Sequence, residues 1–329
     1  MLKFIIKRLL LAALILFFVM FIIYILMSSL PQGYFESTAR ELATKPGNTK
    51  TADQWLSELR EQYGMDKGPI QGYFTWLSSA IKGNFGDSWL WTMPVTEKFA
   101  DVIWYSFALG LASFILTIIV AIPLGVLAAK KQYSLTDYSI TVLSLIGISM
   151  PVFFIATIFK LVFAIKLQWF EIGGMQGNTY NNLDAFHQFL DRADHFVLPI
   201  LTLTVVSIGS LMRYTRTNTL EVLNADYIRT ARAKGLPESK VIGLHAFRNT
   251  LIPIVTVLGG SLPGLFSGAL ITETLFSIRG IGYISYYSMT SGDIPFTMFY
   301  LSFIAVLTLL GTLIADILYA VVDPRVRIN

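Results

Sequence analysis

The sequence predicts an all-α integral membrane protein with six transmembrane helices and with both termini in the cytoplasm. Of its 329 residues, 54% are hydrophobic and only 14% are charged, and long apolar runs recur along the chain. A soluble domain carries roughly 25% charged residues, so much of this apolar surface must face lipid. Basic residues gather in alternate segments between the runs, which indicates the topology.

The residue types that the sequence lacks exclude several functions. The chain has no cysteine, so disulfides, thiolate metal sites and cysteine nucleophiles are excluded. Its three histidines, His187, His195 and His245, are too scattered to indicate a metal site. The sequence contains no GxxxxGKS/T, GxSxG or HExxH motif, so it has no phosphate-binding loop and no recognisable catalytic centre. If ATP drives this protein, a separate subunit must hydrolyse it.

Residues 1–30 are predicted to form a cytoplasmic tip and the first transmembrane helix. Three basic residues precede a nearly unbroken apolar run from Leu9 to about Leu30. A run of about 20 residues can cross about 30 Å of hydrocarbon, whereas the core of a signal peptide has only about 7–15 residues. We therefore expect this run to be a retained span.

Residues 31–100 are predicted to form an external segment with short helices. Turn signals occur at Pro46-Gly47 and at Gly68-Pro69. Apolar residues follow helical spacing in DQWLSELREQYG and in IQGYFTWLSSAIKG. We interpret the segment as a helical cap without direct ligand contact, and contact with a ligand is the alternative.

Residues 101–329 are predicted to form a five-helix core. Its spans are expected at about 102–129, 138–164, 196–212, 251–274 and 299–322. Pro123 lies inside the first of these, where neighbouring protein can satisfy the carbonyl that proline leaves free. Pro151 is expected to kink the next span, and Lys160 is expected to extend from its outer end to water.

The distribution of charge indicates the orientation of the spans. Lys130 and Lys131 stop one span, and Arg213 and Arg216 end another, on the side that also holds the basic N-terminus. This concentration of basic residues in short inner loops agrees with the positive-inside rule. The net charge of +4 is therefore explained by topology, and we expect no nucleic-acid partner.

Three glycines in the fifth span, Gly260, Gly264 and Gly268, are spaced by four residues. On one continuous helix they would share a face and let another backbone approach closely. We interpret this stripe as a helix-packing surface, and a border of the transport pathway is the alternative.

Two acidic residues in the spans, Glu273 and Asp316, are costly in a membrane and are therefore informative. Solvation or pairing with a neighbouring span would explain either one, and contact with a ligand is the alternative. Glu273, Arg279 and Tyr283 are our candidates for the pathway or for an external gate.

A polar stretch at about 221–249 lies between two spans, and our interpretation of the other segments depends on it. Asp226 to Lys234 suit a short helix, and Gly235 fits the left-handed position that commonly closes a helix. Pro237 suits the first turn of a second helix, which is expected to run from Lys240 to Phe247. Two short helices joined at Gly235 would form a rigid surface to which another protein can bind. The alternative is a basic loop that only connects the two spans.

The stretch DYIRTARAKGL closely resembles the cytoplasmic coupling loop of ABC importer permeases, in the form found in the peptide and nickel branch. Other stretches resemble the same family in chain order: EQYGMDKGPIQGYFTWL with GNFGDSW, IPLGVLAA, GISMPVFF, TETLFSIRGIGYISYYS and DPRVRIN. The resemblance therefore covers nearly the whole chain.

Three departures from the family pattern occur. Arg229, Thr230 and Ala231 stand where the general pattern has Glu-Ala-Ala, and Phe247-Arg248 replaces Leu-Pro. These two departures resemble the B-type peptide permeases. Arg279 stands before GIG, where the family usually has a small residue or proline.

The resemblance implies a type I ABC importer permease fold, closest to the B-type oligopeptide or dipeptide permease. It implies a multi-pass protein of a prokaryotic cell membrane that forms half of a peptide pathway. The implied partners are a second permease subunit, two ATP-binding subunits, an external substrate-binding protein and membrane lipid. No cofactor is expected on this chain, and ATP with Mg²⁺ is expected in the ATP-binding subunits. The residues implied to couple to the ATPase are Asp226, Tyr227, Arg229, Thr230, Ala231, Ala233, Lys234, Gly235 and Leu236.

Other functions remain as alternatives. Import of nickel, a metal chelate or another small solute is the closest one within the family. A self-contained secondary transporter would instead move its solute without ATP, and a membrane anchor or assembly protein would not transport at all. The absence of paired metal-ligating residues in the spans favours peptides.

The topology can be tested with single cysteines, because the natural chain has none. An impermeant thiol reagent applied to intact cells should label cysteine at Asn48 and at Asn178, and should spare cysteine at Ser239. Labelling of the Ser239 position from outside would contradict the six-span topology.

Overall fold

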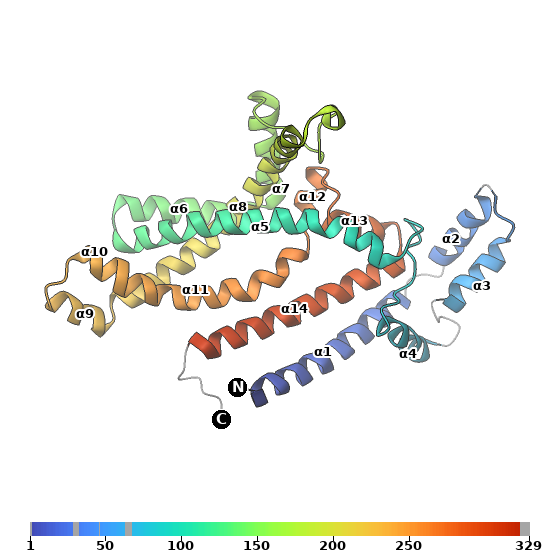
Figure 1. Cartoon of the computed structure of the whole chain (residues 1–329), viewed down its shortest axis with the longest axis horizontal. Helices are drawn as coiled ribbons and strands as arrows, with labels where there is room; N and C mark the ends of the chain where they lie inside the picture. The colour runs from blue at the N-terminus through green and yellow to red at the C-terminus, as the bar shows by residue number, and fades with distance from the viewer. Residues whose placement is uncertain (1, 29–32, 46, 63–67, 323–329) are drawn as a thin grey trace. The chain divides into compact units, whose positions relative to one another are not determined.

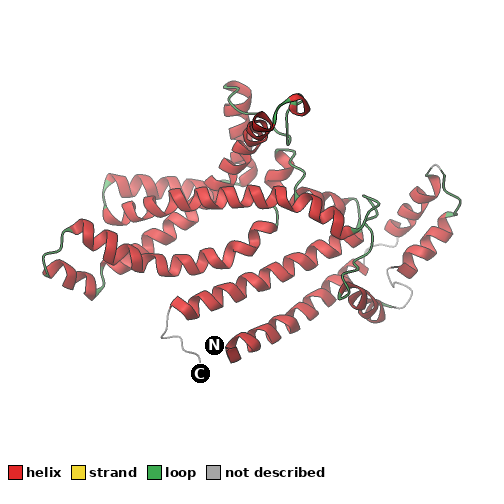
Figure 2. Cartoon of the chain, in the orientation of Figure 1, coloured by secondary structure: helices red, strands yellow, loops and turns green. Residues whose placement is uncertain are grey.

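The computed structural model describes residues 2–28, 33–45, 47–62 and 68–322. Within these ranges every regular element is a helix and no strand occurs, as Figure 2 shows. The all-α prediction is therefore confirmed. The structure divides into two compact units, Met1–Asp101 with Ser285–Leu309, and Val102–Ile284 with Leu310–Asn329.

The first unit is built on α1 (Leu2–Ser28), which packs against α4 (Pro69–Ala80). Tyr73 of α4 is fully buried, and its hydroxyl donates a hydrogen bond of 2.9 Å to the carbonyl of Phe17. Its ring lies edge-on to Phe17, Phe21 and Tyr24. A tyrosine suits this position because its ring is apolar while its hydroxyl can satisfy a buried acceptor. The external helix predicted at this position is thus anchored on the first span.

A helical hairpin of α2 (Gly33–Thr44) and α3 (Ala52–Gln62) belongs to the same unit, within the segment predicted to be external. Helix α2 was not predicted, because its sequence is mostly polar and buries little beyond Ala39. The side chain of Asn48 joins the two helices: its amide donates to the carbonyl of Ala43 and accepts from the indole of Trp55, both at 3.0 Å. Cysteine at Asn48 would break these bonds, so the neighbouring exposed Thr49 is the better topology reporter.

The remaining part of the first unit is fastened by Asp293, which precedes α14 (Ile294–Val322). Its buried carboxylate accepts hydrogen bonds from the hydroxyl of Ser88 and from the backbone N–H groups of Trp89 and Phe296. A carboxylate at the start of a helix is stabilised by the free N–H groups there. The loop before α5 (Val95–Lys130) is thereby fastened to the beginning of α14.

Five helical segments in the described ranges are long and apolar enough to cross a membrane. They are Ile6–Met27, Val95–Lys130, Ala185–Leu223, Glu238–Phe266 and Ile294–Leu318. A bent pair of helices between the second and third of these makes six when it is counted as one span. The DPRVRIN ending lies outside the described residues.

The bent pair corrects the kink expected at Pro151. Helix α6 (Leu135–Ser149) stops there, and α7 (Val152–Phe159) with a π-helix (Lys160–Lys166) leaves at an angle of 104° (Figure 1). Proline lacks the N–H that would continue the helix, and Met150 before it is extended, with ψ 129°. The result is a break in the helix and not a kink.

Lys160 also differs from the expectation that it extends to water. Its ammonium donates a hydrogen bond of 2.7 Å to the carbonyl of Leu275, the last residue of α12 (Leu270–Leu275). A cation at this end satisfies a free carbonyl and complements the helix dipole. Lys160 therefore fastens the π-helix to α12 inside the second unit.

The fourth and fifth spans differ in length from the prediction. Helix α8 (Ala185–Leu223) continues beyond the expected 196–212 at both ends. The fifth span runs through α11 (Phe247–Ser261) and a 3-10 helix (Leu262–Phe266) and ends there, short of the expected Thr274. Helix α13 (Ile281–Thr290) follows α12 and leads to α14.

A buried ion pair joins α6 to α8 in the second unit. The guanidinium of Arg216 donates to both carboxylate oxygens of Asp137, with Nε–Oδ1 2.7 Å and Nη2–Oδ2 2.8 Å. Asp137 also accepts the backbone N–H of Tyr133 at the turn before α6. Two parallel bonds of this kind fix the geometry as well as the separation of the two helices.

We expect Asp137→Asn to destabilise the chain by about 2–4 kcal/mol, because it leaves the cation of Arg216 without its partner. This loss of stability is smaller than the roughly 3–5 kcal/mol lost when one partner of a fully buried ion pair is removed, because the Arg216 side chain is 26% exposed. Thermal melting of the purified complex measures the effect. Arg213→Gln removes an exposed arginine from the same helix and should leave the melting temperature unchanged, so equal losses in both variants would contradict this role.

Candidate functional site

The candidate docking surface is built on α9 (Asp226–Ala233), at one end of the second unit (Figure 1). One face of this helix is buried: Ile228 and Ala231 pack against Val241 and Ala246. Leu236, which follows the helix, packs against the same cluster. The segment from Asp226 to Phe247, which we call the knuckle, therefore has a small core of its own, which holds α9 in place.

Gly235 closes α9 in the left-handed conformation, as the sequence predicts, with φ 75°. Its N–H donates to the carbonyl of Arg232 at 2.9 Å, and the N–H of Leu236 donates to the carbonyl of Ala231 at 3.4 Å. This pair of bonds is the Schellman arrangement that ends many helices. A Cβ at Gly235 would meet no atom within 4 Å, so backbone conformation and not space requires glycine here.

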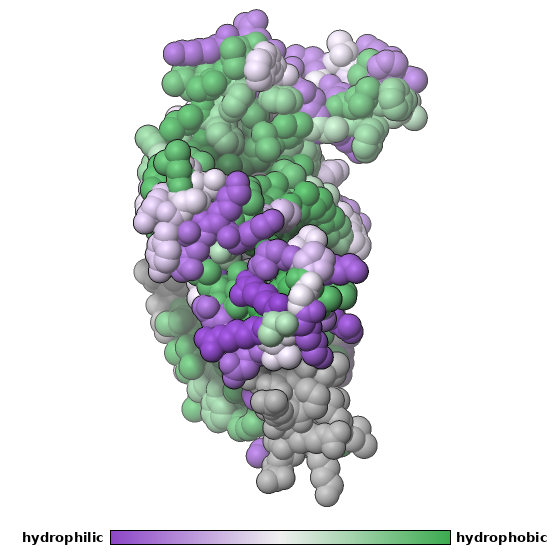
Figure 3. Space-filling view, turned by 90° about the vertical axis from the view of Figure 1, so that its left-hand side faces the viewer, coloured by the Kyte–Doolittle hydropathy of each residue, from purple (hydrophilic) through white to green (hydrophobic). Residues whose placement is uncertain are grey.

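The outward face of α9 is polar and basic. Arg232 forms a two-bond ion pair with Glu238, with Nη2–Oε1 2.7 Å, which braces the corner after Gly235. Figure 3, which views this end of the molecule, shows a hydrophilic patch on the described residues there. The exposed members of the predicted coupling set are Asp226, Tyr227, Arg229, Thr230, Ala233, Lys234 and Gly235. Ala231 and Leu236 belong instead to the core under the helix, so their role in the knuckle is to support α9.

The second helix of the knuckle is not a separate element, contrary to the prediction. Helix α10 (Glu238–Lys240) continues through a π-helix (Val241–Ala246) directly into α11. Pro237 is the cap before this helix and not its first residue, and Leu244 is exposed instead of facing the core. The wider turn of the π-helix shifts the side-chain positions relative to the α-helical spacing assumed from sequence. The knuckle is thus joined to the fifth span without a loop.

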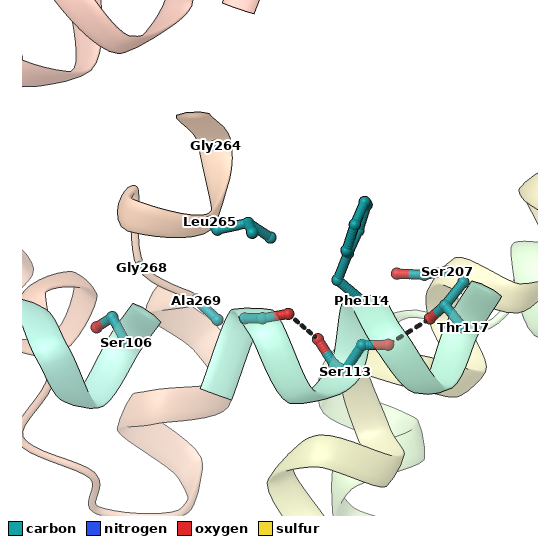
Figure 4. A pocket seen from close by; sticks show the side chains of 10 residues that line it. Ser106, Ser113, Phe114, Thr117, Ser207, Gly264, Leu265, Gly268 and Ala269 are labelled. Carbon is teal, nitrogen blue, oxygen red and sulfur yellow. Dashed lines mark hydrogen bonds between the residues drawn. The ribbon is translucent and has the colours of Figure 1, made fainter. Parts of the chain in front are cut away.

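A groove runs along α5 in the same unit and encloses a cavity of about 190 Å³, lined by small and hydroxyl-bearing residues and by the apolar Phe114 and Leu265. Ser106, Gly110, Ser113 and Thr117 line it at helical spacing, and Ser207 of α8 lies across from them. The hydroxyls of Ser113 and Thr117 donate to carbonyls of their own helix, at 3.0 and 2.7 Å (Figure 4). Polar residues on a membrane helix face protein or a water-filled space, so this stripe faces away from lipid.

The three glycines predicted to form one packing stripe do not share a helical face. Gly260 packs against α14, where a Cβ would lie 3.0 Å from the Cβ of Ala315. Gly264 lies in the 3-10 helix and lines the groove, and a Cβ there would meet nothing within 4 Å. Gly268 has φ 80° and lies after the span has ended. A Cβ at Gly268 would lie 2.5 Å from the backbone N of Gly282, so Gly260 and Gly268 both permit the expected close approach, each to a different segment, whereas Gly264 does not.

Glu273 is fully buried, and its carboxylate connects three segments of the chain. It accepts hydrogen bonds from the hydroxyl of Ser106 at 2.6 Å and from the backbone N–H groups of Ala269 and Tyr283 at 2.8 and 2.9 Å. Ser106 in turn accepts the N–H of Ile281 at 2.7 Å. Every partner is a donor, as an ionised carboxylate requires. This arrangement makes Glu273 a structural support beside the groove, with its oxygens turned away from any ligand.

Tyr283 and Arg279 lie close to this support. The backbone of Tyr283 is fixed by Glu273, and its side chain lines a second, larger cavity. Arg279 is exposed and lines the same cavity, together with Arg192 of α8.

Comparison with known proteins agrees with this geometry. Residues 121–328 match the family model described as the binding-protein-dependent transport system inner membrane component, and residues 1–93 match the model for its N-terminal part. The chain belongs to this family. The predicted resemblance to ABC importer permeases, and with it the non-enzymatic role of this chain, is confirmed.

Relatives cover most or all of the chain. The oligopeptide transport system permease protein AppB of Bacillus subtilis is 39% identical over 81% of this chain and 83% of its own length. OppB of Haemophilus influenzae, also an oligopeptide transport system permease protein, is 32% identical over 99% of this chain and 100% of its own length. The dipeptide transport system permease protein DppB of Lactococcus lactis is 33% identical over the full length of both chains.

Sequence reasoning missed several residues that organise this permease. Asp137 and Arg216 were assigned to inner segments only by their charge, and nothing in the sequence paired them across 79 positions. The stripe at Ser106, Gly110, Ser113 and Thr117 was overlooked inside an apolar span. Its helical spacing of small and polar residues is a signal that could have identified it.

The different surroundings of two glycines give a test of the groove. Gly264→Leu should leave the yield and melting temperature of the permease complex unchanged, because a side chain there enters open space. It should lower substrate uptake several-fold, because the leucine fills the groove. Uptake into liposomes at equal complex content measures this.

Gly260→Leu is the matched control. Its side chain would meet α14, so we expect a loss of stability of about 1–3 kcal/mol from overpacking. Failure of the Gly264→Leu complex to assemble would instead show that Gly264 lies in a packed interface.

Proposed function

We propose that this chain is one permease subunit of an ATP-driven importer of peptides, and that it forms half of the translocation pathway. The observation that carries the proposal is the match over the whole chain to permeases named for oligopeptide and dipeptide transport. The groove on α5 supports it, because a peptide pathway needs a cavity within the spans, and this one is lined by small, hydroxyl-bearing and apolar residues.

Peptides are favoured over nickel and other small solutes. The relatives compared are named for the transport of oligopeptides, dipeptides or di- and tripeptides. The groove offers hydroxyl groups and backbone, which can accommodate many side chains, whereas a metal ion would need several ligating side chains together. A self-contained secondary transporter and a membrane anchor do not fit the family.

The partners follow from the type of importer proposed. A second permease subunit would complete the pathway, and an external substrate-binding protein would deliver the peptide. Two ATP-binding subunits would hold ATP and Mg²⁺, and the present chain would bind no cofactor. The surroundings would be the lipid of a prokaryotic inner membrane, with the basic end of the second unit in the cytoplasm.

The coupling mechanism starts at the exposed face of α9, which would sit in a cleft of an ATP-binding subunit. Because α9 rests on its own core with Val241 and Ala246, movement of the ATP-binding subunit would carry the π-helix with it. The π-helix continues into α11 and the 3-10 helix, which ends at the groove. The groove would then alternate between two packed states, each favoured by a different ligand state of the ATPase.

Substitution at the corner of the knuckle tests this coupling. Valine at Gly235 is β-branched and is unsuited to φ 75°, so we expect strain of about 1–3 kcal/mol there. Gly235→Val should insert normally, bind its ATP-binding subunits weakly, and lose substrate-stimulated ATP hydrolysis and peptide uptake together. Gly235→Asn should retain more activity, because asparagine tolerates the left-handed region.

Gly243→Val is the matched control in the same cytoplasmic segment. Gly243 is also open to space but lacks the left-handed backbone, so valine there should keep both activities. ATP turnover and peptide uptake are compared in liposomes at equal complex content. Full coupling in Gly235→Val would mean that the loop is a plain connector.

A further inference from the structure

The second unit contains a cavity of about 640 Å³ at the end where α7, α8 and α12 meet. Its lining includes Tyr105 of α5, Gln176 of the α7–α8 connection, Arg192 of α8, and Ser277, Arg279 and Tyr283 after α12. Apart from Tyr105, which lies at one end of the span expected at about 102–129, these residues lie in segments expected outside the membrane. The volume lies within the roughly 300–1,000 Å³ of small-molecule sites.

Two arginines, Arg192 and Arg279, and no acidic residue line the cavity. Neither Arg192 nor Arg279 forms an ion pair with any acidic side chain of the described residues. The guanidinium of Arg192 lies over the ring of Tyr180, with 4.7 Å from Cζ to the ring centroid. Two like charges on one concave surface create a positive potential that attracts an anion.

The acidic side chains near the cavity are used elsewhere. Asp191 accepts the N–H of Gly177 at 2.8 Å, and Asp194 accepts the N–H of Glu171 at 3.1 Å. Glu273 is occupied by its three donors beneath the cavity. None of these carboxylates bridges to the two arginines.

The walls of the cavity are held by hydrogen bonds within the unit. The N–H of Gly174 donates to the carbonyl of Phe276 at 2.8 Å, which fastens the α7–α8 connection to the segment that carries Arg279. The bond from Gly177 to Asp191 fastens the same connection to α8 beside Arg192. The site is therefore preformed, as ligand sites usually are.

We propose that this cavity is an entry site for the C-terminal carboxylate of the incoming peptide, held by Arg192 and Arg279. A guanidinium binds a carboxylate through two parallel hydrogen bonds, which makes arginine well suited to this group. Every linear peptide with a free C-terminus carries this carboxylate whatever its sequence, so the site recognises peptides without selecting their side chains. The inference rests on the proposed function.

The first test measures the potential in the cavity with a single cysteine at Gln176. Gln176→Cys in the full complex is treated with a sulfonate-bearing and a trimethylammonium-bearing thiosulfonate reagent, each normalised to its rate with a free thiol. We expect the anionic reagent to react about tenfold faster. Arg192→Gln with Arg279→Gln should remove the preference, and Lys166→Gln, an exposed cation outside the lining, should keep it. Equal rates in the parent Gln176→Cys complex would overturn the proposal.

The second test asks what occupies the site. The reaction of the Gln176→Cys complex with an uncharged thiol reagent is measured with and without each peptide. The factor by which trialanine slows this reaction should be at least five times the factor for trialanine amide. Arg279→Gln should abolish this difference, whereas Arg279→Lys should keep part of it because the charge remains. Equal protection by the acid and the amide would overturn the proposal.

A carboxylate of the binding protein is the other possible source of the same chemistry. If Arg279→Gln weakens docking of the loaded binding protein while trialanine gives no protection, the cations belong to a docking surface and the proposal fails. Uptake of trialanine by the wild-type complex is measured in parallel. If trialanine is taken up but does not protect the cysteine, the proposed entry site is wrong and the proposed function as a peptide importer stands. If no peptide is taken up in an ATP-dependent way, both the entry site and the proposed function are wrong.

Discussion

The buried carboxylate of Glu273 is the constraint on which the arrangement around the groove depends. It holds Ser106 of α5, the break after Gly268 and the start of α13 through bonds that all point toward it. Side chains at Gly280 or Gly282 would collide with its Oε2, at 2.7 and 3.0 Å. The groove and the arginine-lined cavity lie on either side of this support, since Ser106 lines one and Tyr283 the other. Burial removes this carboxylate from water, and the three donors offset the cost of that burial.

The sequence was sufficient for the fold class, for most spans and for the glycine corner. These features depend on local properties: apolar runs long enough for a membrane, and a glycine where the chain must turn left-handed. Gly235 is an example, because the positive φ angle at this position requires glycine, and no contact with a distant residue does. The family resemblance added the peptide importer, which composition and spacing alone did not reach.

Features that depend on distant residues were not accessible in this way. The spacing of Gly260, Gly264 and Gly268 predicts a shared face only if the helix continues, and the local signal that it tightens at Leu262, the pair Pro263-Gly264, was overlooked. Glu273 was read as a possible gate, because its donors come from residues up to 167 positions away. The chain bends by 104° at Pro151, which is more than a kinked helix would bend, because Met150 before the proline also has an extended backbone.

The π-helix at Val241–Ala246 has a consequence for the register between the knuckle and the membrane. A π-helical turn holds an extra residue compared with an α-helical one, and each α-helical residue turns the chain by about 100°. Loss of a single residue that converted this segment to a regular α-helix would therefore leave the direction of α9 nearly unchanged, whereas loss of a residue from the α-helical α11 would turn α9 by about 100° about the axis of the fifth span. The π-helix thus gives the connection between α9 and the fifth span one residue more than a regular α-helix of the same orientation would hold.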